Sequence, residues 1–126
     1  MRIKSIAIAT VCLLPLGSVF AQQSESGATG SMKSALLAPN GLIYEGNCGD
    51  QFFAGQMAFV EQGGKLSVKI VGRAGTCNSP VEPSGDGIKF EGCNGAMHFV
   101  TYNPSKGRYP FSGKLGFLCS YDMRPN

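Results

Sequence analysis

Hydrophobic and polar positions alternate along most of the chain from residue 42 onward. The alternation is most regular over residues 65–71, where Leu66, Val68 and Ile70 fall on one face and polar side chains on the other. Strict alternation is typical of a strand with one buried and one solvated face. By the same criterion we expect strands at residues 42–48, 53–61 and 96–102, and one or two more over residues 108–121.

Turn residues separate these segments. Gly63 and Gly64 form a two-residue link between two expected strands, which predicts a hairpin because glycine adopts positive φ without steric cost. The segment 72–87 contains Pro80 and Pro83, so it cannot form a central strand.

Two stretches of the chain resemble one another. GLIYEGNCG at 41–49 and GIKFEGCNG at 87–95 match at a constant offset of 46 residues, and each precedes a hairpin and a further cysteine. One interpretation is a duplicated three-strand unit. The other is convergent turn chemistry in a glycine-rich chain. The order Asn47-Cys48 is reversed in the second copy, and a shift of one residue along a strand would turn a side chain to the other face.

The expected fold is all-β: a small antiparallel β-barrel or sandwich of six to eight strands, with two related three-strand units if the repeat is real, stapled by two disulfides. We favour the barrel, because closing a sheet limits its exposed edges.

The N-terminus has the three parts of a secretory signal. Arg2 and Lys4 precede an apolar run, and Val19-Phe20-Ala21 supplies a small-residue cleavage site. We therefore predict a cleaved signal peptide at 1–21, a flexible leader at 22–40 and a single β domain at 41–126. The apolar run is too short to cross a bilayer, so we expect an exported protein, periplasmic or secreted, with no membrane anchor.

Signal cleavage also changes the cysteine count. Loss of Cys12 leaves Cys48, Cys77, Cys93 and Cys119, an even set that predicts two disulfides in an exported chain. If each repeat unit runs up, down and up, all four cysteines lie at one end. Pairing within each unit, Cys48–Cys77 and Cys93–Cys119, is then the simplest, while Cys77–Cys93 with Cys48–Cys119 stays open. The spacing contains no CxxC pair, and we expect no metal and no cofactor.

Charge excludes one class of partner. The chain carries +3, and without Arg2 and Lys4 nine basic residues face eight acidic ones. This near-neutral balance lacks the basic excess of a nucleic-acid-binding protein.

Few residues could support catalysis. His98 is the only histidine, it lies in an expected strand facing opposite to Met97 and Phe99, and we expect it on a wet or half-buried face. No GxSxG motif is present.

Glu45 and Glu91 occupy equivalent positions of the repeat, and two converging carboxylates can hydrolyse glycosidic bonds. Each follows an aromatic residue and should point away from the core. A small secreted hydrolase that uses Glu45 and Glu91, or His98, is therefore the alternative function, and we expect no enzyme.

The turn between two late strands is the best candidate for recognition. It is rich in tyrosine and arginine, which supply contact area with hydrogen-bonding tips. The candidate binding residues are Tyr102, Lys106, Arg108 and Tyr109. The leading hypothesis is a non-enzymatic exported binding protein whose partner is another protein, as in a hydrolase inhibitor or a secreted virulence or interaction factor. A further alternative is a carrier of a small apolar ligand, which needs a cavity of about a few hundred Å³ inside the barrel.

Overall fold

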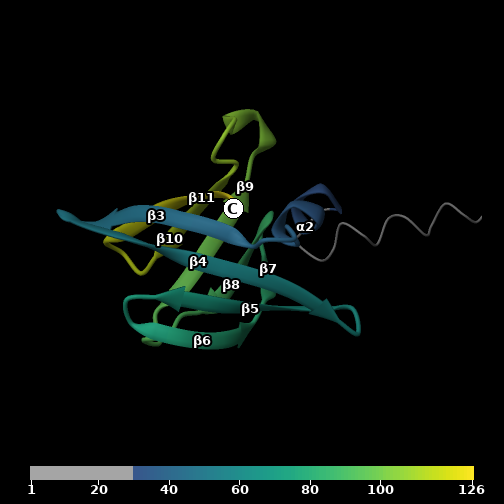
Figure 1. Ribbon diagram of the computed structural model, residues 1–126, viewed down its shortest axis with the longest axis horizontal. Helices are drawn as coiled ribbons and strands as arrows, with labels where there is room; N and C mark the ends of the chain where they lie inside the picture. The colour runs from purple at the N-terminus through teal and green to yellow at the C-terminus, as the bar shows by residue number, and fades with distance from the viewer. Residues whose placement is uncertain (1–29) are drawn as a thin grey trace, which may run out of the picture.

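The computed structural model describes residues 30–126, which form a short helix and one antiparallel sheet (Figure 1). The helix, α2, spans Gly30–Leu36, and a 3-10 turn, η2, spans Pro104–Lys106. The nine strands are β3 (Leu42–Cys48), β4 (Gln51–Gln62), β5 (Lys65–Gly72), β6 (Gly75–Pro80), β7 (Glu82–Ser84), β8 (Gly87–Glu91), β9 (Met97–Tyr102), β10 (Phe111–Leu115) and β11 (Cys119–Pro125). The all-β prediction is confirmed, and the strand count exceeds the expected range because the proline-rich segment contributes β6 and β7.

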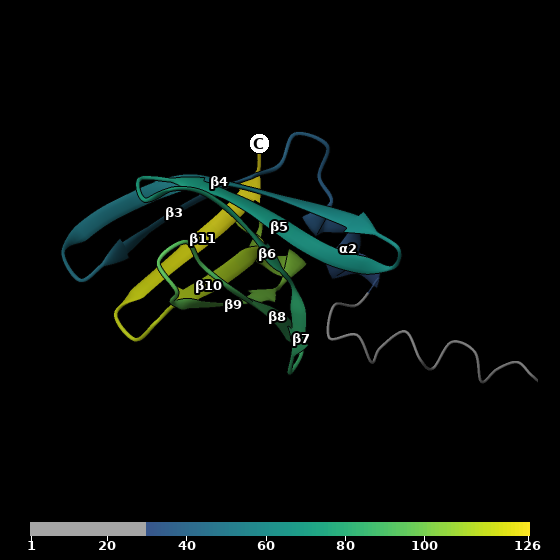
Figure 2. The same cartoon turned by 90° about the horizontal axis from the view of Figure 1, so that it is seen from below.

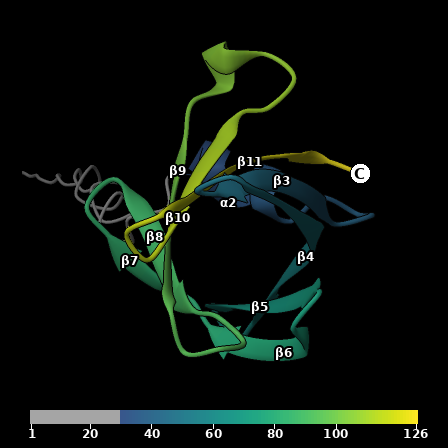
Figure 3. The ribbon, with the colours of Figure 1, turned by 90° about the vertical axis from the view of Figure 1, so that its left-hand side faces the viewer.

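The strands form a nearly closed barrel. Their order in the sheet is β6-β5-β4-β3-β11-β10-β9-β8-β7, so most strands pair with their neighbours in the chain. The exception is the pairing of β11 with β3, which joins the last strand to the first from Cys119 opposite Cys48 to Pro125 opposite Leu42. Viewed along the barrel, the strands surround a common centre (Figure 3). The predicted hairpin between β4 and β5 is confirmed, with φ of +61° at Gly63 and +80° at Gly64.

The barrel has one seam, between β6 and β7. Pro80 ends β6 and Pro83 lies within β7, and both strands are edges of the sheet, where a missing N–H donor does least harm. Two contacts cross the seam. They are the Cys77–Cys93 disulfide and the hydrogen bond that Ser79 Oγ donates to the Glu91 carbonyl. The two edges are thus held together without a continuous ladder.

Alternate residues point into the barrel and fill one end of it. Helix α2 lies at that end (Figure 2). Its Met32 and Leu36 side chains are buried in the same core as Leu42 and Met57. An ion pair joins Lys33 of α2 to Glu61 near the end of β4. Segment 30–36 therefore packs against the barrel, whereas the sequence predicts a flexible leader up to residue 40. The predicted signal peptide and residues 22–29 lie outside the described residues.

The disulfides lie at the opposite end. The strands are antiparallel, so the end where β3 finishes is also where β11 begins and where the turn after β8 lies. All four cysteines gather there, as predicted. The favoured pairing was wrong, however: the bonds are Cys48–Cys119 and Cys77–Cys93. The reason is sheet closure, which places β3 beside the final strand β11 and places Cys77 on an edge that faces the turn after β8 across the seam.

The two similar stretches occupy comparable places. Leu42 and Tyr44 in β3, and Ile88 and Phe90 in β8, are all buried, at matching positions of the two motifs. Each strand also begins a three-strand meander, and the two meanders proceed in the same direction around the sheet. The order Asn47-Cys48 is reversed to Cys93-Asn94 in the second stretch. This reversal does not turn a strand residue to the other face, because Cys93 lies beyond the end of β8, whereas Cys48 is the last residue of β3.

The two disulfides fit a location outside the cytoplasm, because disulfides persist in compartments where thiols are not kept reduced. Among residues 30–126, no helix is long and apolar enough to cross a membrane.

Candidate functional site

The loop between β9 and β10 stands away from the barrel (Figure 3). Its base is closed by a hydrogen bond from Asn103 N to the Pro110 carbonyl at 2.8 Å. The Asn103 side chain accepts from Ser105 N at 3.0 Å and so caps η2, while Gly107 ends the turn at a φ of +84°. These bonds give the loop a defined shape, which favours recognition because less ordering is needed on binding.

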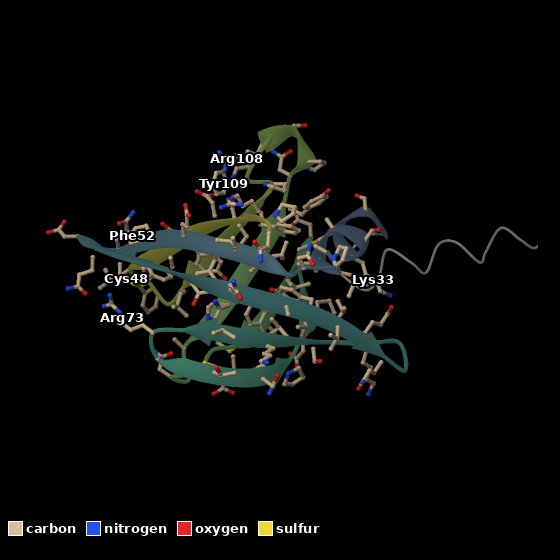
Figure 4. The ribbon with its side chains drawn as sticks, viewed as in Figure 1. Lys33, Cys48, Phe52, Arg73, Arg108 and Tyr109 are labelled. Atoms are coloured by element: carbon tan, nitrogen blue, oxygen red, sulfur yellow. A yellow bond between two sulfur atoms is a disulfide. The ribbon has the colours of Figure 1, made fainter. Side chains whose placement is uncertain are left out.

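The tyrosines of this loop face the barrel. Tyr102 is half-buried and packs its ring 5.0 Å from that of Phe111, so its main role is structural. The Tyr109 hydroxyl donates to Glu45 Oε1 at 3.3 Å. The guanidinium carbons of Arg108 and Arg124 lie 5.8 Å and 5.9 Å from the centre of the Tyr109 ring. Tyr109 is therefore held on the outer face of β3 and β11, and Arg108 remains exposed (Figure 4).

Lys106 makes a second attachment of the loop. Its Nζ lies 3.0 Å from Asp122 Oδ1 on β11 and also donates to Ser112 Oγ on β10. Of the four candidate binding residues, two thus anchor the loop to the sheet and one packs against Phe111. Arg108 is exposed, and its guanidinium lies over the Tyr109 ring.

The sheet residues that hold the loop, Glu45, Ser112 and Asp122, also line a hollow on the outer face of the sheet. We call this hollow, of about 600 Å³, the outer groove; it crosses β3, β11, β10 and β9. Phe52 and Phe99 stand at the groove with exposed fractions of 61% and 45%. The polar and charged side chains lining it include Glu45, Asn47, Ser112, Lys114 and Asp122. Register places Asn47, Ser120 and Lys114 between the two phenylalanines, which therefore flank a polar middle. Exposed aromatic side chains are enriched in protein interfaces.

Two glycines account for the curvature beneath the groove. Tyr121 lies in register with Gly46 on one side and Gly113 on the other. A Cβ at Gly113 would lie 2.2 Å from the Tyr121 ring, and one at Gly46 would lie 2.5 Å from the Tyr121 Cβ. Strand glycines permit such close approaches and sharp bends. The buried tyrosine and its two glycines therefore allow the sheet to bend at this point.

The two glutamates of the hydrolase hypothesis do not converge. Strands β3 and β8 are separated in the sheet by β11, β10 and β9. Glu45 and Glu91 both point away from the core, as expected, and so lie on different sides of the barrel. Glu45 is instead bonded to Tyr109. This arrangement lacks the facing carboxylates that glycoside hydrolysis requires.

His98 is buried, with 4% of its surface exposed, so the expectation of a wet or half-buried face was wrong. Alternation separates His98 from Met97 and Phe99 but does not say which set points inward. The pairing of His98 with Phe90 of β8 turns it into the barrel, where its ring stacks on Phe90 at 4.8 Å. Its Nδ1 lies 2.8 Å from the Tyr121 hydroxyl.

Burial shifts the ionisation of this interior pair. Desolvation lowers the pKa of His98 to about 4, so the imidazole is neutral at neutral pH. Desolvation, with a smaller contribution from the neighbouring Tyr44, raises the pKa of Tyr121, and burial also raises the pKa of Tyr44. The interior of the barrel therefore has polar atoms but no charge at neutral pH.

A second cavity, which we call the open-end cavity, lies at the disulfide end of the barrel and measures about 390 Å³. Its wall includes Tyr44, Phe53, Ile70, His98 and Leu115 from the strands and Arg73 from the β5–β6 turn. Near it, the β10–β11 turn exposes Phe117 fully and Leu118 to 80%. The apolar pair Phe117-Leu118 between Gly116 and Cys119 was visible in the sequence, and an apolar pair in a turn is the signal that could have marked this end.

Within residues 30–126, no group of three His, Cys, Asp or Glu side chains is placed to hold a metal ion. Comparison of the chain with protein-family models, with curated proteins and with solved structures finds no match.

Proposed function

We propose that the protein is an exported, non-enzymatic binding protein that recognises another protein through the outer groove and the β9–β10 loop. One observation carries the proposal: Lys106 and Tyr109 anchor the loop to Asp122 and Glu45, which themselves line the groove. Loop and groove are thus one continuous surface on a rigid barrel. Binding sites are commonly built in this way, from loops positioned by a stable scaffold.

The chemistry of the surface suits a protein partner. Phe52 and Phe99 can act as apolar anchors, and Arg108 at the loop offers an exposed planar donor that has no ion-pair partner among residues 30–126. Aromatic and arginine side chains dominate the binding energy of protein interfaces. Carboxylates and a lysine between the two phenylalanines supply polar contacts of both signs. A hydrolase is a suitable partner class, because its substrate cleft would accept a projecting, preorganised loop.

The first test identifies the partner by site-directed cross-linking. A benzophenone amino acid replaces Arg108 in one variant and Lys65, in the β4–β5 hairpin, in a matched control. Both are exposed to extracts containing exported and host proteins. We expect a cross-linked protein at position 108 that is absent at position 65. The same products at both positions, or none specific to position 108, would contradict the proposal.

The second test measures affinity for that partner. The double variant Phe99→Ser with Arg108→Ala should lose at least about 2 kcal/mol of binding, roughly 30-fold in Kd, because two anchors are removed. The matched control, Val60→Ser with Lys65→Ala, removes an exposed apolar and a basic residue from β4 and the hairpin that follows it. Unchanged affinity in the groove variant would remove this surface as the site. If the partner is a hydrolase, its inhibition should weaken in parallel.

A further inference from the structure

The open-end cavity is a second candidate binding site and does not rest on the proposed function; Phe52 is the one residue that lines both it and the outer groove. Its volume of about 390 Å³ lies within the range of small-molecule sites, which begins at about 300 Å³. An apolar cavity of about 150 Å³ holds one benzene molecule. The open-end cavity therefore has room for a two-ring aromatic body or a chain of similar size.

The wall of the cavity is mainly apolar and aromatic. Phe53 and Tyr44 meet at 5.9 Å between ring centres, and Ile70 and Leu115 complete the inner surface. Helix α2 and the packed core fill the other end of the barrel, and the residues that line this space lie towards the disulfide end. An apolar ligand body placed here would be removed from water on several sides, which is the main source of affinity in such sites.

The two disulfides hold the rim in place. Cys48 and Cys93 both line the cavity, and each belongs to a different bond, Cys48–Cys119 and Cys77–Cys93. The first ties two hairpins together, and the second closes the seam. A rim fixed in this way needs little reorganisation to accept a ligand.

Charge defines the class of ligand. Arg73 is the only charged residue among the described residues that line the cavity, and it lies in the two-residue turn between β5 and β6 at the rim (Figure 4). The ion pairs found over residues 30–126 join Lys33 to Glu61, Lys89 to Glu82 and Lys106 to Asp122, so none uses Arg73. A guanidinium without a protein carboxylate matches the planar carboxylate of a ligand.

Deeper in the cavity the polar atoms are uncharged. His98 lines the wall with its Nδ1 bonded to the Tyr121 hydroxyl at 2.8 Å. A ligand charge at this depth would have no counter-ion and would be costly to desolvate. The charged group of a ligand therefore belongs at the rim and its apolar part inside.

We propose that the open-end cavity binds a small amphipathic carboxylate, with its apolar body against Phe53 and Leu115 and its carboxylate at Arg73. The ligand class follows from the juxtaposition of an uncharged apolar interior and one free guanidinium at the mouth.

Titration calorimetry with 2-naphthoate and its neutral isostere 2-naphthamide tests this proposal on the oxidised protein. We expect saturable binding of one naphthoate per chain, tighter than naphthamide and weakened by salt. Arg73→Gln should weaken the binding of naphthoate about fivefold, which is the upper range for an exposed ion pair. The affinity for naphthamide should not change. Lys69→Gln on the outer face of β5 removes one positive charge away from the cavity and is the matched control.

Two variants test the location. Ala74→Trp places a large ring in the exposed β5–β6 turn, and Leu115→Trp fills the cavity from the inside. Each should abolish binding of both compounds, with thermal unfolding used to confirm that the barrel is intact. The groove variant Phe99→Ser with Arg108→Ala should bind naphthoate normally. The proposal is overturned if naphthoate does not saturate a single site, if it binds no better than naphthamide, or if both tryptophan variants bind as the wild type does.

Discussion

The two ends of the barrel are stabilised by different means. At the α2 end, Met32, Leu36 and Leu42 are almost completely buried and fill the interior. At the disulfide end, the interior retains a cavity of about 390 Å³, and the hairpins carry exposed Phe117 and Leu118. Side-chain packing stabilises the α2 end, and disulfide bonds stabilise the other end. The difference shows how a chain of this size can keep an unfilled, ligand-sized space: cross-links constrain the region where a core is missing.

Among the changes that test this difference between the two ends, loss of the Cys48–Cys119 disulfide should lower the free energy of unfolding most. The bond closes a segment with a sequence separation of 71 residues, and the entropy of the cross-linked unfolded chain predicts a loss of about 4 kcal/mol for Cys48→Ala with Cys119→Ala. Cys77→Ala with Cys93→Ala, separated by 16 residues, should lose about 3 kcal/mol. Urea unfolding gives the free energies. Hydrogen exchange should show protection lost first near the cavity and last near α2; uniform loss would contradict the division between the ends.

Truncation of the packed end should have a slightly smaller effect. Leu36→Ala removes a fully buried side chain and leaves a cavity beneath α2, which should cost about 3 kcal/mol in unfolding free energy. Leu118→Ala is the matched control at the open end, where 80% exposure limits the expected change to about 0.5 kcal/mol. Equal losses measured by urea unfolding would show that the open end is packed in solution.

The buried histidine should make the protein sensitive to acid. The pKa of His98 is lowered from 6.5 to about 4 in the folded chain, so the unfolded chain binds more protons between these values. Stability is therefore fully present above pH 6.5 and falls as the pH drops towards 4, by roughly 2 to 3 kcal/mol. His98→Gln should lack this part of the pH dependence. Glu91→Gln, an exposed change, should retain it, and parallel pH profiles for wild type and His98→Gln would contradict the prediction.

Local features of the fold could be predicted from the sequence. The bounds of β3 match the prediction, and the Gly63-Gly64 hairpin follows directly from the conformational freedom of glycine. The prolines at 80 and 83 correctly excluded a central strand, since β6 and β7 are the sheet edges. These features depend on residues close together in the chain, so local patterning determines them.

Features that depend on closure could not be predicted. Disulfide pairing follows from which strands become neighbours, and the contact between β3 and β11 has no local signal. The prediction that His98 faces solvent was wrong for a related reason. Alternation shows that residues lie on opposite faces of a strand, but the partner strands determine which face is buried. The outer groove depends on the bend at Gly46 and Gly113 around Tyr121, three residues brought together by the same closure. Composition singles out Tyr109 and Lys106 as candidates, but their partners Glu45 and Asp122 lie on strands distant in sequence.

The position of β11 has a consequence for the order of folding. It is the last strand along the chain, yet it lies in the middle of the sheet and separates β3 from β10. Asn126 N also bonds to the Gly41 carbonyl at 3.0 Å, beside the first strand. A chain synthesised from its N-terminus can form β3–β6 and β7–β10 as separate partial sheets, but it cannot join them until residues 119–125 have emerged. Closure of the barrel therefore follows the emergence of β11, and a nascent chain lacking these seven residues exposes two unpaired strand edges to chaperones and proteases.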